Sequence, residues 1–309
     1  MKPWTVPGQE PGERERPGAD KEGEQRPRPE SESGTESVIE AEMKIENKIE
    51  AMIENKIETQ IKTRITGIEK KTEGPGIYLE LADVLDVLEQ ALEQRTPLSL
   101  VRIGDGENLV LAQDTVWPLR RVLAERWAVK ANRGQKGLTL PNLRLRDEVA
   151  EAVRRADVVG ILPEDDDTIK APADLKRALT DRVFAHHRLN PPVACHACVN
   201  RELAVTPRFW ELLRGRRVLI VTALAEELRA LLAAEPYGLD VAGTYVFTGN
   251  AQMEEALAFI EAAAEDFDVA LFSCGVNAVV LAQQTAERTG RVAIDFGKAI
   301  RILLYGKPN

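Results

Sequence analysis

The sequence predicts an α/β domain with a Rossmann-like, mostly parallel β-sheet that helices cover on both faces, preceded by a long helix and a disordered N-terminal tail. From about Leu79 onward, short and almost wholly apolar runs alternate with amphipathic stretches of helical period. Strands buried on both faces read as continuous apolar runs, and this alternation is typical of a parallel sheet between two layers of helices. The first 78 residues differ in composition, which sets them apart from this domain.

The N-terminal 37 residues are rich in proline, glycine and charge. They contain 6 of the 17 prolines and 5 of the 21 glycines of the 309-residue chain, together with nine acidic and six basic side chains. Such a segment buries too little apolar surface to offset the entropy lost on ordering. Residues 1–37 are therefore predicted to be disordered.

Residues 38–73 carry an isoleucine repeat. Isoleucine recurs at every fourth position from Ile45 to Ile65, with polar residues between and no glycine until Gly67. This pattern predicts one long amphipathic helix. Because four exceeds the 3.6 residues of a helical turn, the apolar stripe winds around the helix, unlike the stripe of a heptad repeat. Two interpretations stay open: a self-association stalk of coiled-coil type that makes the protein a homo-oligomer, and a solvated linker.

Gly74, Pro75 and Gly76 mark the boundary of the folded domain, which we place at 78–309. Apolar runs of strand type lie at 98–104, 157–163, 216–222, 241–247, 268–275 and 291–297. Segments of helical period lie at 81–95, 145–156, 173–189, 224–234, 251–266 and 277–290. A strand after nearly every helix predicts parallel pairing, and ligands of such sheets bind at the carboxyl ends of the strands.

Composition excludes several classes. The formal net charge of −9 disfavours non-specific binding to nucleic acid or to anionic membranes. No apolar run is long enough for a transmembrane segment, and the N-terminus lacks the apolar core of a signal peptide. Three cysteines do not make a disulfide framework, so we expect a cytoplasmic protein.

The first predicted strand of the domain ends in Arg-Ile-Gly-Asp-Gly-Glu, residues 102–107. Gly104 and Gly106 would let the backbone turn and approach a ligand closely. The carboxylates of Asp105 and Glu107 would converge on one divalent cation, whose other ligands are substrate phosphates. The alternative is a plain turn with Asp105 as a helix cap.

Three segments carry a resemblance to a known family. Residues 98–114 resemble the opening motif of the GT-D-fold glycosyltransferases, an apolar strand followed by Arg-x-Gly-Asp-Gly-Glu with an Asp-x-Glu metal motif. Residues 267–300 are similar to that family's closing strand, glycine turn, helix and strand, which end in Asp-Phe-Gly. A weaker similarity covers 199–222. Together they span about 79–305.

The resemblance implies a metal-dependent enzyme that uses a nucleotide-sugar donor, with a UDP-hexose favoured, and a glycan or glycoprotein acceptor. Asp105 and Glu107 would hold Mn²⁺ or Mg²⁺ against the donor diphosphate, whose developing charge the ion neutralises. Arg102 and the two glycines would shape the diphosphate site. The family often has a histidine after Asp-Phe-Gly, where this chain has Lys298.

Further candidates for substrate binding follow other predicted strands. They share a polar side chain or a glycine at a strand's carboxyl end, and they are Asn200, Thr222, Gly275, Asn277, Asp295 and Lys298. The start of the segment after Gly275 would be a helix N-terminus, which attracts anions. Ordinary turn and cap chemistry explains each of these residues equally well.

The catalytic base is unassigned, with the acidic run 164–167 and Glu202 in reserve. Cys195 and Cys198 form a C-x-x-C without the second pair that a zinc site needs, so a buried strand is the simpler interpretation. His186 and His187 suit a helix C-terminus. Two other functions stay open: a non-catalytic scaffold that binds nucleotide sugars, and a metal-dependent phosphohydrolase.

Overall fold

A computed structural model describes residues 76–307, which fall within one structural unit of the chain, 68–309. The predictions for the tail at 1–37 and for the helix at 38–73 lie outside the described residues. The predicted domain at 78–309 lies almost wholly within them.

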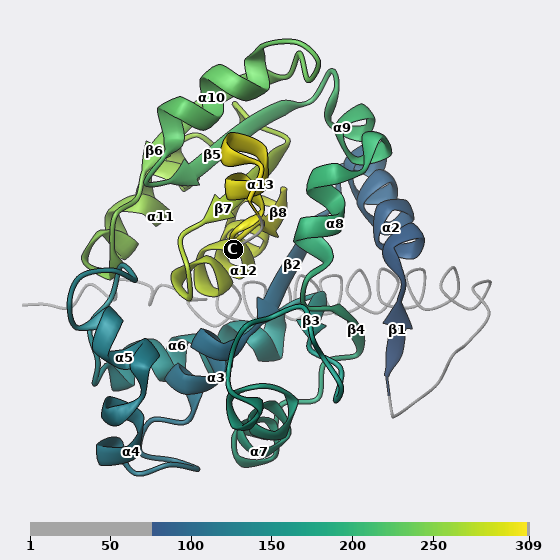
Figure 1. Ribbon diagram of the computed structural model, residues 1–309. Helices are drawn as coiled ribbons and strands as arrows, with labels where there is room; N and C mark the ends of the chain where they lie inside the picture. The colour runs from purple at the N-terminus through teal and green to yellow at the C-terminus, as the bar shows by residue number, and fades with distance from the viewer. Residues whose placement is uncertain (1–75, 308–309) are drawn as a thin grey trace, which may run out of the picture. The chain divides into compact units, whose positions relative to one another are not determined.

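The core of the domain is one eight-stranded, all-parallel sheet, which confirms the predicted fold class (Figure 1). Its spatial order is β1-β4-β3-β2-β8-β7-β5-β6. The strands are β1 (Ile77–Leu79), β2 (Leu98–Ile103), β3 (Val158–Ile161), β4 (Val193–His196), β5 (Arg217–Thr222), β6 (Asp240–Val246), β7 (Val269–Ser273) and β8 (Val292–Asp295). All predicted strands are present, and the three-residue β1 is too short to leave a recognisable pattern in the sequence.

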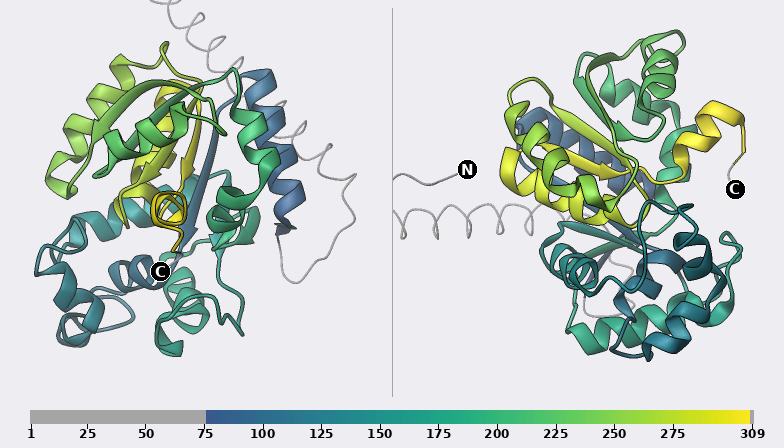
Figure 2. Two further views of the ribbon diagram at one scale, coloured as in Figure 1. Left: turned by 45° about the horizontal axis from the view of Figure 1, so that its top comes forward. Right: turned by 90° about the vertical axis from the view of Figure 1, so that its left-hand side faces the viewer.

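Helices cover both faces of the sheet (Figures 1 and 2). On one face α12 (Asn277–Thr289) packs on β2, β7 and β8, with α6 (Leu143–Arg155) and α11 (Met253–Ala262) beside it. The other face carries α2 (Leu81–Gln94), α8 (Val199–Val205), α9 (Pro207–Leu213), α10 (Ala225–Ala233) and α13 (Ala299–Tyr305). Two short 3₁₀ turns lie at Ala173–Leu175 and Asn250–Gln252, and α7 (Arg177–His187) follows the first of them.

The strand order reverses between β2 and β8. From β2 the chain moves outward to β3 and β4, whereas β7 and β8 approach β2 from the opposite half of the sheet. In an open parallel sheet, ligands bind at the carboxyl ends of the strands where the order reverses. The Arg-Ile-Gly-Asp-Gly-Glu turn after β2 and the Asp-Phe-Gly turn after β8 therefore lie side by side at this switch point.

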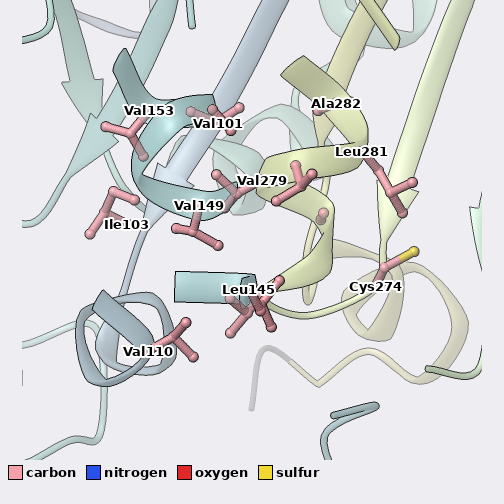
Figure 3. Packing of buried hydrophobic residues seen from close by; sticks show 14 of the residues in the cluster. Val101, Ile103, Val110, Leu145, Val149, Val153, Cys274, Val279, Leu281 and Ala282 are labelled. Atoms are coloured by element: carbon pink, nitrogen blue, oxygen red, sulfur yellow. The ribbon is translucent and has the colours of Figure 1, made fainter. Parts of the chain in front are cut away.

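The largest buried cluster lies beneath this point. Figure 3 shows Val101 and Ile103 of β2 close to Val149 and Val153 of α6, with Val279 of α12 beside Val149. Nine of the thirteen residues of α12 are buried, which is unusual for a surface helix and reflects its cover by α6 and α11. The strand ends at the switch point thus rest on a rigid base.

The segment between β2 and α6 was not anticipated from the sequence. It forms α3 (Asp105–Leu111), α4 (Leu119–Ala124) and α5 (Arg126–Ala131). Helices of six or seven residues span too few turns to produce a recognisable apolar period. In the part of the chain that the structure describes, every helix is too short or too polar to cross a membrane.

Candidate functional site

Arg102, the next-to-last residue of β2, ties together the strand ends at the switch point. Its Nε donates to the Asp295 carbonyl oxygen and its Nη2 to Asp295 Oδ1, each at 2.9 Å. Its Nη1 donates to the Ala197 carbonyl oxygen at 3.0 Å and to Asn200 Oδ1 at 3.1 Å. Protein groups thus fix the guanidinium, and the acidic side chain that it binds is Asp295 rather than Asp105 or Glu107.

Two glycines make room for this arginine. A Cβ added to Gly160 of β3, which is paired with Arg102, would lie 3.0 Å from the Arg102 Cγ. A Cβ added to Gly297 would lie 2.0 Å from Arg102 Nη2, and the Gly297 φ of +46° is itself unfavourable for other residues. Gly160 lay in a predicted strand, where its role could not be foreseen.

Asp295 and Asn200 are buried on either side of Arg102. Asp295 is 1% exposed and Asn200 is 0% exposed. The Asn200 amide donates to the Phe296 carbonyl oxygen at 2.7 Å, which fixes the turn after β8. Burial raises the pKa of Asp295, while the charge of Arg102 opposes that rise. Asp295 Oδ2 has no hydrogen-bond partner in the described part of the chain.

Asp105 and Glu107 lie in the first turn of α3 and are both partly exposed. Residues two apart on a helix do not share a face, and Glu107 Oε2 turns back to accept a hydrogen bond from the Gly104 N–H at 2.9 Å. Desolvation raises the pKa of Glu107 to about 7, and the charges of Asp295 and Asp105 add to this rise against the charge of Arg102. Glu107 is thus held beside other acidic groups, and the charge of Arg102 offsets their effect only in part.

The glycine turn serves packing as well as backbone bending. Gly104 has an ordinary extended backbone with φ −113°. Gly106 lies under the indole of Trp127, and a Cβ there would approach Trp127 Cζ2 to 2.7 Å. Lys136 in turn places its Nζ 5.6 Å from the centre of the Trp127 ring. Neither Trp127 nor Lys136 follows a predicted strand, and only their position in the fold reveals them.

The remaining candidates divide into buried supports and an exposed cation. Thr222 (1% exposed) donates to the Ser273 carbonyl oxygen at 3.1 Å. Asn277 (0% exposed) donates to the carbonyl oxygens of Gly137 and Cys274, both at 3.2 Å. Gly275 takes a positive φ of +60° in the turn before α12. Lys298 is exposed at the start of α13.

None of the reserve candidates for a catalytic base takes part in the hydrogen bonds around Arg102. Residues 164–167 follow β3, and three of them line a cleft of about 510 Å³ with Lys176, Arg177 and Asp181. Asp166 there forms an ion pair with Lys176 at 2.9 Å. Glu202 is exposed on α8. Cys195 lies in β4, as the buried-strand interpretation expected, and both it and Cys198 are free thiols.

The donor set for a metal consists of two carboxylates. Within residues 76–307 no group of three or more histidine, cysteine, aspartate or glutamate side chains could hold a metal ion. Mg²⁺ and similar ions commonly take one or two carboxylates and fill the other positions with substrate phosphates and water. The raised pKa of Glu107, which Arg102 offsets only in part, and the unpartnered Asp295 Oδ2 fit a cation at this edge of the sheet.

The fold and the site define an α/β protein whose polar strand ends meet at a topological switch point of a parallel sheet. A family model described as GT-D fold-like domain matches residues 79–303. The chain therefore belongs to the GT-D-like family and has a glycosyltransferase-type fold. No curated protein and no solved structure matches it.

Proposed function

We propose that the protein is a metal-dependent glycosyltransferase, which moves a sugar, most simply a hexose from a UDP-hexose, to a hydroxyl of a glycan or glycoprotein acceptor. The observation that carries the proposal is the family match over 79–303 together with the position of Asp105 and Glu107 at the switch point. An acidic pair at the carboxyl end of a central strand is where a metal–diphosphate complex would bind.

In this proposal Asp105 and Glu107 hold Mn²⁺ or Mg²⁺, which when bound neutralises the charge that develops on the departing diphosphate. Because the pKa of Glu107 is raised to about 7, binding of a cation there would release a proton from the fraction of Glu107 that is protonated. Lys298 contributes a second positive charge from the turn after β8. Gly104, Gly106 and Gly275 belong to the turns that line the crevice.

The buried polar residues support the site from behind. Arg102, Asn200 and Asp295 lock the ends of β2, β4 and β8 to one another through the bonds described above. Thr222 and Asn277 do the same for the turn after β7. We propose that these residues position the backbone that faces the donor, because their side chains are almost fully enclosed.

The test is hydrolysis or transfer of UDP-sugars with and without Mn²⁺, comparing the wild type with Asp105→Asn and Glu107→Gln. We expect both variants to lose activity and metal response by at least a hundredfold, since each removes one of the two anionic ligands. Glu93→Gln, at an exposed position of α2 to which no role in the site is assigned, is the charge-matched control. Wild-type rates and metal response in both site variants would refute the assignment.

The same assay separates the two other functions. Binding of UDP with no transfer to any acceptor would indicate a scaffold. Release of phosphate from simple phosphoesters without sugar transfer would indicate a phosphohydrolase. A thermal-shift screen of nucleotide sugars with and without Mn²⁺ would identify the donor, since a ligand that binds only the folded state raises its melting temperature.

A further inference from the structure

The loop of residues 132–142, which we name the bridging loop, joins α5 to α6 and reaches across the crevice to the other half of the sheet. Its base is closed by Asn132, whose amide exchanges hydrogen bonds with the backbone of Leu140 at 2.7 and 2.9 Å. The Gly137 carbonyl oxygen accepts from the Asn250 N–H at 2.7 Å and from Asn277 Nδ2 at 3.2 Å. The loop is thus anchored to the turns before α11 and α12.

In the sequence Lys136 lies between Asn132, which closes the base of the loop, and Gly137, which anchors the loop to the other half of the sheet. Its carbonyl oxygen is close to Gly275, where an added Cβ would lie 3.5 Å from it. Its ammonium group lies over Trp127, which covers Gly106 of the acidic motif. The lysine therefore spans the edge of the sheet from the turn after β7 to the turn after β2. Its partly enclosed side chain is directed by its neighbours rather than left free in solvent.

Lys298 brings a second cation to the same place. The pKa of Lys136 is lowered first by burial and then by the charge of Lys298, while Asp105 and Glu107 raise it. The charge of Lys130 also lowers this pKa, so all four of these charged side chains are close enough to Lys136 to affect it. Within residues 76–307 neither Lys136 nor Lys298 has an ion-pair partner within 4.0 Å. Two ammonium groups that repel each other and make no direct ion pair within the described residues form a site that a multiply charged anion would stabilise.

We propose that Lys136 is a second phosphate-binding residue, which acts opposite Lys298 on the diphosphate group of a nucleoside diphosphate donor. The inference rests on the proposed function for the identity of that donor. Asp105 and Glu107 approach the diphosphate through the metal, and the two lysines contact its oxygens directly. Because the bridging loop is anchored on both sides of the crevice, Lys136 is held in place before the ligand arrives.

The experiment measures binding by calorimetry with the full-length chain, using UDP, uridine and inorganic pyrophosphate, each in EDTA and in Mn²⁺. Lys136→Met removes the charge and keeps much of the side-chain volume, and Lys136→Arg restores the charge. Arg133→Gln, on the same loop but exposed, is the matched control. We expect Lys136→Met to weaken UDP and pyrophosphate binding about tenfold or more, as for a lost charge-assisted hydrogen bond. Uridine binding and the Arg133→Gln variant should be unaffected.

The outcomes separate this inference from the proposed function. If the wild type binds UDP and Lys136→Met binds it equally well, the role of Lys136 is refuted and the proposed function stands. If the wild type binds pyrophosphate but shows no preference for UDP, and Lys136→Met loses pyrophosphate, the anion site stands and the nucleotide donor does not. If the wild type binds neither anion, both fail. A loss in Lys136→Met that Lys136→Arg does not recover, with a lowered melting temperature, would mark a structural role and refute the inference.

Discussion

Replacement of Gly297 by alanine tests the central contact of the site. The added Cβ would lie 2.0 Å from Arg102 Nη2, a distance that no pair of non-bonded heavy atoms tolerates. The guanidinium cannot move aside without cost, because it is held by four hydrogen bonds and by the charge of Asp295. Breaking a buried ion pair costs about 3–5 kcal/mol, and alanine at a positive φ costs about 1 kcal/mol more.

Gly290→Ala provides the matched control. Gly290 also has a positive φ, of +68°, at the end of α12, but a Cβ there would meet nothing within 4 Å. Its replacement therefore carries only the backbone cost of about 1 kcal/mol. We expect Gly297→Ala to lower the free energy of unfolding by about 3 kcal/mol more than Gly290→Ala does. For a domain of this size the added difference corresponds to about 6–12 °C in melting temperature.

The assay is urea unfolding followed by circular dichroism, supported by calorimetry. A double-mutant cycle with Arg102→Met isolates the clash, since Gly297→Ala should then cost no more than Gly290→Ala. Equal destabilisation by Gly297→Ala and Gly290→Ala in the wild-type background would refute the argument. It would mean that Arg102 can be rearranged freely, and that it does not lock the ends of β2 and β8 together.

Three further predictions follow from the same contacts. Folding raises the pKa of Glu107 from 4.5 to about 7, so the folded state binds this proton more tightly than the unfolded state does. The contribution of Glu107 to stability is therefore full below about pH 4.5 and is lost as the pH rises through 7. In EDTA, Glu107→Gln should flatten the pH dependence of the free energy of unfolding over that range. Asn277→Ala should release Gly137, speed hydrogen exchange in the bridging loop and weaken UDP binding as Lys136→Met does; unchanged exchange would contradict this anchoring. If the isoleucine repeat is a self-association stalk, deletion of residues 1–72 should lower the mass per particle measured by light scattering, whereas a monomer before and after deletion would exclude the stalk.

The strands and long helices of the domain could be predicted because their burial leaves a periodic signal. Eight parallel strands must be covered by helices on both faces. The buried strands therefore appear in the sequence as apolar runs, and the covering helices appear as amphipathic segments. The order of the strands leaves no such record, because any right-handed crossover is compatible with the same alternation. The proximity of the turns after β2 and β8, which are nearly 200 residues apart in the chain, was therefore visible only through the family resemblance.

The site was predictable where a motif is local and unpredictable where it is assembled. Asp105 and Glu107 follow a strand directly, so their position at its carboxyl end could be inferred. Their side-chain directions could not, because the helix α3 begins at Asp105 itself and Glu107 folds back onto Gly104. Lys136 lies in a polar stretch without periodicity, and it reaches the crevice only because Gly137 is bound by residues more than 100 positions away.

The charged side chains at the switch point give the strongest reason to assign the acidic pair and the two lysines to one ligand site. Arg102 is committed to Asp295, so it leaves Asp105 and Glu107 without a cation that binds them directly. Lys136 and Lys298 carry the missing positive charge but are held apart from the carboxylates, without ion pairs within the described residues. Unpaired charges of both signs at one partly enclosed edge of the sheet reduce folding stability. Such unfavourable arrangements occur mainly at functional sites. A divalent cation bound to a diphosphate would satisfy both sets at once, because its metal faces carboxylates and its phosphate oxygens face ammonium groups. A carboxylate or a bare phosphate would satisfy only the lysines, and this difference is the reason for the metal–diphosphate ligand that we propose.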